Sequence, residues 1–143
     1  MPHISSNYKS ASDAPIGKWC SAPTSKLKPV SILPKGAVTD SPDYLGQCVS
    51  YVKRVCGSLT LTKTDKWKAG KKLQKGVSIN SGTAIAWFNA KGKYNFHTAI
   101  FDSKDSKGIY VYEQYVIQGG KALSKSFKTW AQVAEKNYCV IEL

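Results

Sequence analysis

The most reactive side chain that this sequence could offer is the thiol of Cys48, at the start of a predicted helix. Gly46 precedes it, and Val49, Val52 and Val55 follow at a spacing that predicts one apolar helix face. A thiol in the first helical turn lies beside unpaired backbone N–H groups, whose partial positive charge favours the thiolate. Cys48 is therefore the candidate nucleophile.

A base for this nucleophile must come from one of two histidines, and His97 is the better candidate because His3 lies in a polar leader. His97 opens a short apolar run that predicts a half-buried strand. The next predicted strand, 108–114, ends in Glu113 and Gln114, and either side chain could orient the imidazole. Neighbouring side chains on a strand point to opposite faces, so only one of the two can face His97.

Each candidate also has an ordinary structural explanation. Cys48 could be a core thiol, His97 a histidine bonded to the backbone, and Glu113 a solvated acid. Together, in the order cysteine, histidine, acid, they favour a nucleophile with its base and an orienting group.

Two further residues are candidates for contacts with a substrate. Gln47 stands beside the nucleophile and could shape an oxyanion pocket with the backbone N–H of Cys48. Trp67 lies in the segment 59–70, which is predicted to be a loop, and could hold a sugar or a peptide beside a cleft. The alternative for Trp67 is a core position, because large aromatic side chains are mostly buried.

An α+β fold, with the Cys48 helix packed on an antiparallel sheet, would position these residues. Strands are predicted at 83–88, 97–102, 108–114, 123–127 and 138–143, with a short helix or ordered turn at 128–136. Short polar connections, such as 103–107, predict antiparallel pairing. A separate helix start is predicted at Ser41-Pro42-Asp43, with serine as the N-cap and proline in the first position.

The length of 143 residues fits a single hydrophobic core. We divide the chain into an extended basic arm over residues 1–40 and a catalytic domain over residues 41–143. Prolines prevent a helix in the arm, and isolated apolar side chains such as Trp19 and Val30 are expected to pin it across the domain.

The charge is strongly positive, since Lys and Arg outnumber Asp and Glu by 21 to 9 and the net charge is +12. Nucleic acid, anionic lipid and the bacterial wall would all suit this charge, and so would solubility alone. No nucleic-acid motif or basic helix accompanies the scattered lysines, so we expect no nucleic-acid partner. No apolar run has the length of a transmembrane segment or a signal peptide, so we expect synthesis in the cytoplasm.

The four cysteines include no CxxC pair and no Cys/His cluster, so we expect no metal site, and the proposed chemistry needs no cofactor. If Cys48 is catalytic, Cys20, Cys56 and Cys139 remain. They could supply one disulfide in an oxidising compartment, but core positions are the favoured interpretation.

Four motifs in a fixed order give the sequence its resemblance to a known family. They are Gly46-Gln47-Cys48-Val49, the strand at 82–86, His97-Thr98-Ala99-Ile100-Phe101 and Val111-Tyr112-Glu113-Gln114. Over residues 40–142 the set resembles papain-like amidases of the NlpC and CHAP type, and in particular the second of the four families of type VI secretion amidase effectors. The resemblance implies a papain-like fold and favours Glu113 as the group that orients His97, while Gln114 stays a candidate substrate contact.

The resemblance also implies a function. Such a protein is a bacterial toxin that hydrolyses peptide crosslinks of peptidoglycan, here the bond between D-alanine and meso-diaminopimelate. It would reach the periplasm of rival cells through the type VI secretion apparatus, and an immunity protein would neutralise it in the producer. Two alternatives stay open: a basic envelope-binding module, which needs no catalytic residues, and a cysteine hydrolase that acts on a protein substrate.

Overall fold

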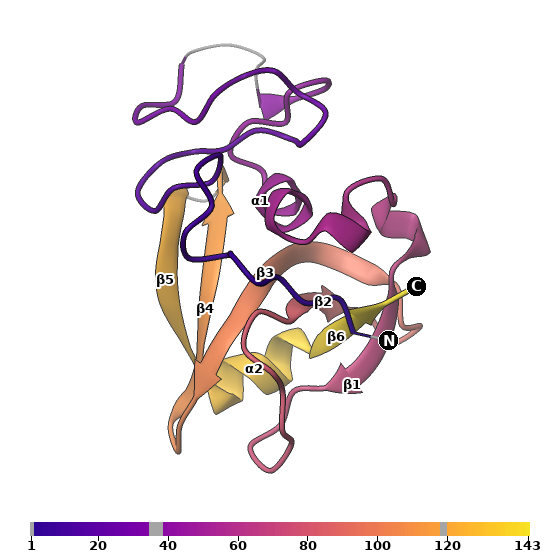
Figure 1. The fold of residues 1–143 in the computed structure, drawn as a ribbon. Coiled ribbons are helices and arrows are strands. Elements are labelled where there is room, and N and C mark those ends of the chain that lie inside the picture. Colours follow the sequence, from indigo (N-terminus) through magenta and orange to yellow (C-terminus); the bar gives the residue numbers. More distant parts are fainter. Residues whose placement is uncertain (1, 35–38, 118–119) are drawn as a thin grey trace.

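A six-stranded antiparallel sheet organises the computed structural model, which describes residues 2–34, 39–117 and 120–143. The strands lie in the order β1-β6-β2-β3-β4-β5, so the last strand along the chain is inserted between the first two (Figure 1). Their bounds are β1 (Lys68–Lys72), β2 (Ala84–Phe88), β3 (Tyr94–Lys104), β4 (Gly108–Tyr115), β5 (Lys121–Thr129) and β6 (Tyr138–Glu142).

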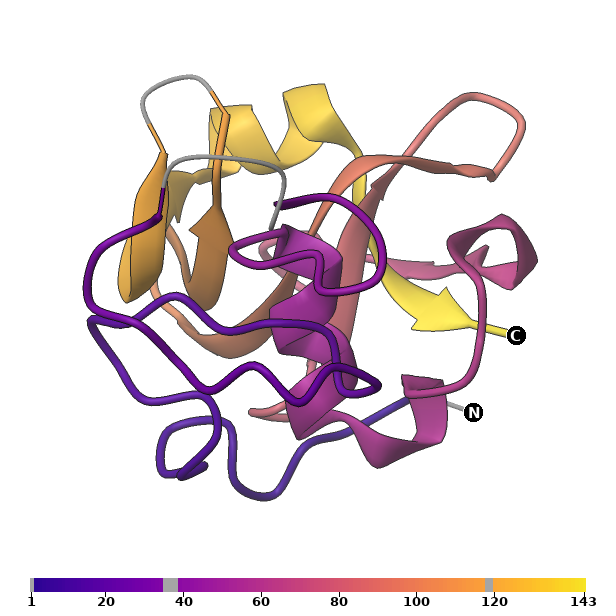
Figure 2. The same ribbon diagram turned by 90° about the horizontal axis from the view of Figure 1, so that it is seen from above.

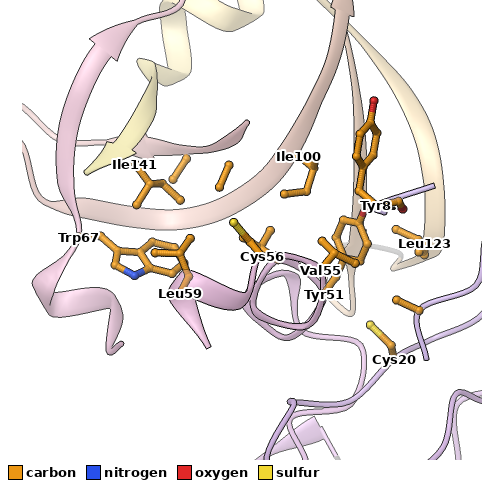
Figure 3. Packing of buried hydrophobic residues seen from close by; sticks show 14 of the residues in the cluster. Tyr8, Cys20, Tyr51, Val55, Cys56, Leu59, Trp67, Ile100, Leu123 and Ile141 are labelled. Carbon is orange, nitrogen blue, oxygen red and sulfur yellow. Dashed lines mark hydrogen bonds between the residues drawn. The ribbon is translucent and has the colours of Figure 1, made fainter. Parts of the chain in front are cut away.

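Helix α1 (Cys48–Val55) covers one face of the sheet and packs on β3 and β4. Its buried side includes Tyr51, Val52 and Val55. The helical spacing predicts Val52 and Val55, whereas Val49, which it also predicts, is only partly buried. Two short 3-10 helices, η2 (Gly57–Leu59) and η3 (Thr64–Lys66), follow α1. Figure 3 shows Tyr51 and Val55 of α1 in a row with Leu59 of η2 and with Trp67, which comes directly after η3. This row faces apolar side chains of the central strands and forms the larger hydrophobic core.

Helix α2 (Trp130–Lys136) lies on the opposite face of the sheet, as the two views of the ribbon show (Figures 1 and 2). Thr129 and Gln132 form a capping box at its start, and Asn137 ends it in the left-handed conformation, with φ of 53°. Val133 packs there against inward-facing residues of β2, β3, β4 and β6, in a second apolar cluster.

The amino-terminal segment crosses the sheet and α1 in irregular structure, seen in indigo in Figure 2. It is joined to β2 near Ser5, to β5 near Gly17 and to the turn before α1 at Cys20. Tyr8 and Cys20 are buried in the larger core, together with Ala11 and Ala14. The part of the predicted arm from Tyr8 to Cys20 therefore shares the core on which the site is built. Residues 1 and 35–38 of the predicted arm lie outside the described residues.

The structure confirms the predicted α+β class, with α1 on an antiparallel sheet, but three local predictions were wrong. Strand β1 lies in the segment predicted as a loop, because it is a lysine-rich edge strand with little burial and has no apolar alternation to reveal it. No helix begins at Ser41; the chain turns there, and Tyr44 and Gly46 have φ of 46° and 80°. Strand β3 begins at Tyr94, three residues before His97.

Candidate active site

Cys48 is the first residue of α1, and the turn before it fixes where its thiol points. Gln47 is extended as the N-cap, and Gly46 has φ of 80°, a conformation that suits glycine. A Cβ at position 46 would collide with Val116 and with the ring of Trp19, so the close packing here also requires glycine. The Cys48 side chain is almost fully buried, with 8% of its surface exposed.

His97 and Glu113 meet behind this thiol, from the neighbouring strands β3 and β4. The two atoms Nε2 of His97 and Oε1 of Glu113 lie 2.7 Å apart, and both side chains are buried. The ammonium of Lys128, on β5, lies 2.9 Å from the other carboxylate oxygen of Glu113 and forms an ion pair with it. The acid is therefore held from both sides.

The protonation states of these groups are coupled. Burial raises the pKa of the Cys48 thiol, but the hydrogen bond and positive charge of His97, with the Tyr94 hydroxyl, bring the pKa below its ordinary value. Burial lowers the pKa of His97, yet hydrogen bonds to Cys48 and Glu113 raise it to about 9. Burial opposes ionisation of Glu113 too, but His97 and Lys128 lower its pKa to about 2. The favoured state is a thiolate beside an imidazolium.

The direction of the histidine ring follows from these contacts. Because Nε2 of His97 is bonded to Glu113, the Nδ1 nitrogen is the one left for Cys48. The indole of Trp87 lies against the other side of the ring, with 5.0 Å between the ring centroids, and Tyr115 contacts it edge-on. The ring that would exchange protons with the thiol is thus fixed in place.

The sulfur of Cys48 has further polar neighbours, among them the backbone N–H of Thr98, which hydrogen-bonds to it. The hydroxyl of Tyr94 and the backbone carbonyl of Phe96 each lie 3.7 Å from Sγ. Phe96 has φ of 84°, an uncommon conformation for an aromatic residue, and 57% of its surface is exposed. No local sequence pattern predicts these contacts, because they depend on the backbone conformation just before His97.

The other residues predicted for the site lie elsewhere or face away. The side-chain amide of Gln47 donates to the carbonyl of Thr39 at 2.9 Å. Trp67 is 1% exposed in the larger core, and its indole N–H donates to the Thr62 hydroxyl (Figure 3). The structure thus brings neither side chain to the thiol.

Gln114 is fully buried and faces away from His97, on the other side of β4 from Glu113. Its side-chain oxygen accepts from the backbone N–H of Cys20 at 2.9 Å. Its amide nitrogen donates to the carbonyl oxygens of Cys20, at 2.9 Å, and of Gln47, at 2.8 Å. This side chain connects the amino-terminal segment to the N-cap of α1.

Two surface hollows are lined by residues next to Cys48 or His97 in the chain, although neither of these two side chains lines a hollow itself. One, of about 650 Å³, is lined by residues that include Gln47, Val49 and Lys53 of the α1 region. The other, of about 690 Å³, is lined by Trp87, Phe96, Lys136 and residues next to them. The immediate neighbours of both reacting side chains thus reach the surface at open hollows.

Cys48 differs chemically from the other three cysteines, all of which are buried free thiols. Burial raises the pKa of Cys20 to about 12 and raises the pKa values of Cys56 and Cys139. Within the described parts of the chain, no three His, Cys, Asp or Glu side chains converge to hold a metal ion. No described helix has the length and apolar content to cross a membrane.

A cysteine at a helix N-terminus, facing a histidine of an adjoining antiparallel sheet with an acid behind it, places the chain in the papain-like class of α+β proteins. Within this class the chain belongs to the family of domesticated amidase effector 2, whose profile matches residues 20–139. The family resemblance noted in the sequence is confirmed.

Two known proteins illustrate the likeness. A domesticated amidase effector 2 of Ixodes scapularis is 44% identical over 71 residues, which are 48% of this chain; the match spans 50% of that relative. The solved structure of a type 6 secretion amidase effector 2 superposes with a TM-score of 0.54 at 23% identity, over 68% of this chain and 81% of that one. This second likeness is one of fold.

Proposed function

We propose that the protein is a peptidoglycan amidase in which Cys48 is the nucleophile, His97 the base and acid, and Glu113 the group that orients His97. The observation that carries the proposal is the contact of His97 with both Cys48 and Glu113 in a buried site. Membership of an amidase effector family supports the same chemistry.

The reaction proceeds in two halves. The Cys48 thiolate forms a bond to the carbonyl carbon of the scissile amide, and the electron pair of the carbonyl moves onto its oxygen. As the tetrahedral intermediate collapses, the carbon–nitrogen bond breaks, and the imidazolium of His97 gives its proton to the leaving amine. A thioester on Cys48 remains.

Water then hydrolyses the thioester. Neutral His97 accepts a proton from the water molecule, the resulting hydroxide attacks the acyl carbon, and the Cys48 sulfur leaves as a thiolate. Glu113 accepts a hydrogen bond from Nε2 throughout and stabilises the imidazolium without taking its proton. No cofactor takes part in either half.

The substrate we propose is the peptide crosslink between D-alanine and meso-diaminopimelate. A crosslink has peptide on both sides of the scissile bond, and the two hollows, one lined by Gln47 and Val49 and the other by Phe96, would offer a place for each. The net charge of +12 favours a polyanionic wall over a neutral peptide. Lys53 in one hollow and Lys136 in the other are positioned for free carboxylates of the stem peptides.

We further propose that the protein acts in the periplasm of target bacteria, after delivery by type VI secretion, and that an immunity protein protects the producing cell. The fold shared with a type 6 secretion amidase effector supports this route. The relative from Ixodes scapularis shows that the family also occurs in an animal, so the activity and the route of delivery are separate proposals with separate tests.

The activity is tested by incubating the protein with purified sacculi and resolving the released muropeptides by mass. We expect crosslinked dimers to be converted to monomers, and Cys48→Ala and His97→Ala to remove this conversion while circular dichroism shows an intact fold. Cys139→Ala is the matched control, since it removes a thiol whose pKa is raised and which lies away from His97. Wild-type release by the Cys48 or the His97 variant would refute the assignment of that residue.

A further inference from the structure

Oxyanion stabilisation in an acyl transfer normally uses two hydrogen-bond donors. The backbone N–H of Cys48, at the start of α1, points toward the site as the first donor. The residue that the sequence suggested for the second, Gln47, has its side-chain amide bonded to the carbonyl of Thr39. Another donor near the sulfur is required.

The hydroxyl of Tyr94 lies 3.7 Å from the Cys48 sulfur, and the structure fixes it there in three ways. Tyr94 belongs to β3 and is paired with Phe88 of β2. Its ring meets the indole of Trp67 edge-on, with 5.2 Å between centroids and an interplanar angle of 77°. Trp67 itself is fully buried and anchored through its indole N–H to Thr62.

Tyr94 also keeps its proton over the whole range in which the enzyme would work. Burial raises its pKa, and so does the neighbouring Cys48 thiolate. The phenol therefore remains a hydrogen-bond donor at a site that carries negative charge, first on sulfur and then on the carbonyl oxygen.

We propose that Tyr94 is a further catalytic residue, whose hydroxyl supplies the second oxyanion donor, and that Trp67 positions it. The hydroxyl bonds to the thiolate in the resting enzyme. When the sulfur–carbon bond forms, the charge moves to the carbonyl oxygen beside the sulfur, and the hydroxyl donates to that oxygen instead, with its own O–H bond intact. The inference rests on the proposed amidase function but can fail without it.

The test compares two reactions of the same thiol in Tyr94→Phe, a change that keeps the ring on Trp67. Amide hydrolysis passes through an oxyanion, whereas alkylation by iodoacetamide forms a sulfur–carbon bond with loss of iodide and has no oxyanion. The number of reactive Cys48 thiols, counted by mass after alkylation, normalises each rate to the folded protein. Tyr112→Phe, which removes another half-buried phenol hydroxyl from the same core, is the matched control.

We expect Tyr94→Phe to lower turnover of a soluble crosslinked muropeptide by about 100-fold per reactive thiol, the usual effect of losing one oxyanion donor. The KM and the alkylation rate on its high-pH plateau should change little. Trp67→Phe keeps the Tyr94 hydroxyl but alters the ring that Tyr94 packs against, so turnover should fall less and the alkylation rate at high pH should stay the same. Tyr112→Phe should match the wild type in both reactions.

Two outcomes would overturn the inference. Turnover of Tyr94→Phe near the wild-type value would show that the hydroxyl is not needed, and equal losses of turnover and alkylation would show that it serves only the thiol. Neither outcome affects the proposed amidase function, which fails if the wild-type protein releases no muropeptides from sacculi.

Discussion

His97 lies between two groups that both favour its charged form, and this sets the pH range in which the protein can act. The imidazolium is lost as the pH rises through about 9, the raised pKa of His97. The thiolate is lost as the pH falls below the lowered pKa of Cys48. We therefore expect a bell-shaped profile of kcat/KM, with its basic limb near pH 9.

Substitution of Glu113 tests which group sets the basic limb. Glu113→Gln removes the carboxylate that raises the pKa of His97, so the limb should move to lower pH and kcat should fall by less than in Cys48→Ala. Lys128→Met removes a positive charge near Glu113 and His97, so the basic limb of the pH profile should stay at the same pH or move to higher pH. Profiles measured on a soluble muropeptide decide this; a limb at the wild-type pH in Glu113→Gln would contradict the orienting role.

For individual residues, the sequence revealed their types and their order but not the direction in which each side chain points. Cys48, His97 and Glu113 could be proposed together because of their residue types, their order along the chain and the family resemblance. The directions taken by Gln47 and Trp67 depend on Thr39 and Thr62, whose positions no local pattern predicts.

Among the elements, β4 carries two adjacent side chains with different tasks. Glu113 supports His97 on one face, and Gln114 joins the amino-terminal segment to the N-cap of α1 on the other. Alternation along a strand explains the division. The α1 N-terminus is therefore held by the same strand that holds the acid, so a displacement of β4 would disturb both sides of the site.

Truncation of Gln114 should cost stability as well as activity. Gln114→Ala leaves the buried N–H of Cys20 without its partner, and the carbonyl groups of Cys20 and Gln47 each lose one of the two hydrogen bonds that they accept; a buried donor left unpaired alone costs roughly 1–3 kcal/mol. We expect a loss of at least about 2 kcal/mol, which lowers Tm by roughly 5–10 °C for a chain of this size. Gln74→Ala, at an exposed glutamine, is the control for thermal unfolding followed by circular dichroism. An unchanged Tm would show that water replaces the amide at no cost.

The element that hydrophobic periodicity did not predict is one whose side chains are little buried. Strand β1 presents Lys68, Lys71 and Lys72 at the edge of the sheet and has no apolar face, so only its pairing with β6 identifies it. Helix α1 and the inner strands were predictable because their buried residues recur at the period of the element.

For the whole molecule, the proposed substrate predicts that toxicity depends on compartment, because peptidoglycan lies outside the inner membrane. Bacteria that express the chain behind an added periplasmic signal should lyse, whereas cytoplasmic expression should be tolerated. Cys48→Ala with the same signal is the control for the burden of export. Optical density and microscopy follow the outcome, and equal killing from the cytoplasm would indicate an internal target.

The place of β6 in the sheet determines when during synthesis the protein can become active. The helix with Cys48 leaves the ribosome early, and His97 and Glu113 follow, but β6, the strand that joins β1 to β2, is made last. A nascent chain can pair β2 with β3, β4 and β5, yet the sheet remains divided until Glu142 has emerged. We expect the reactive thiol to be assembled only once β6 has left the ribosome, so that nascent chains that stop before Glu142 show no activity.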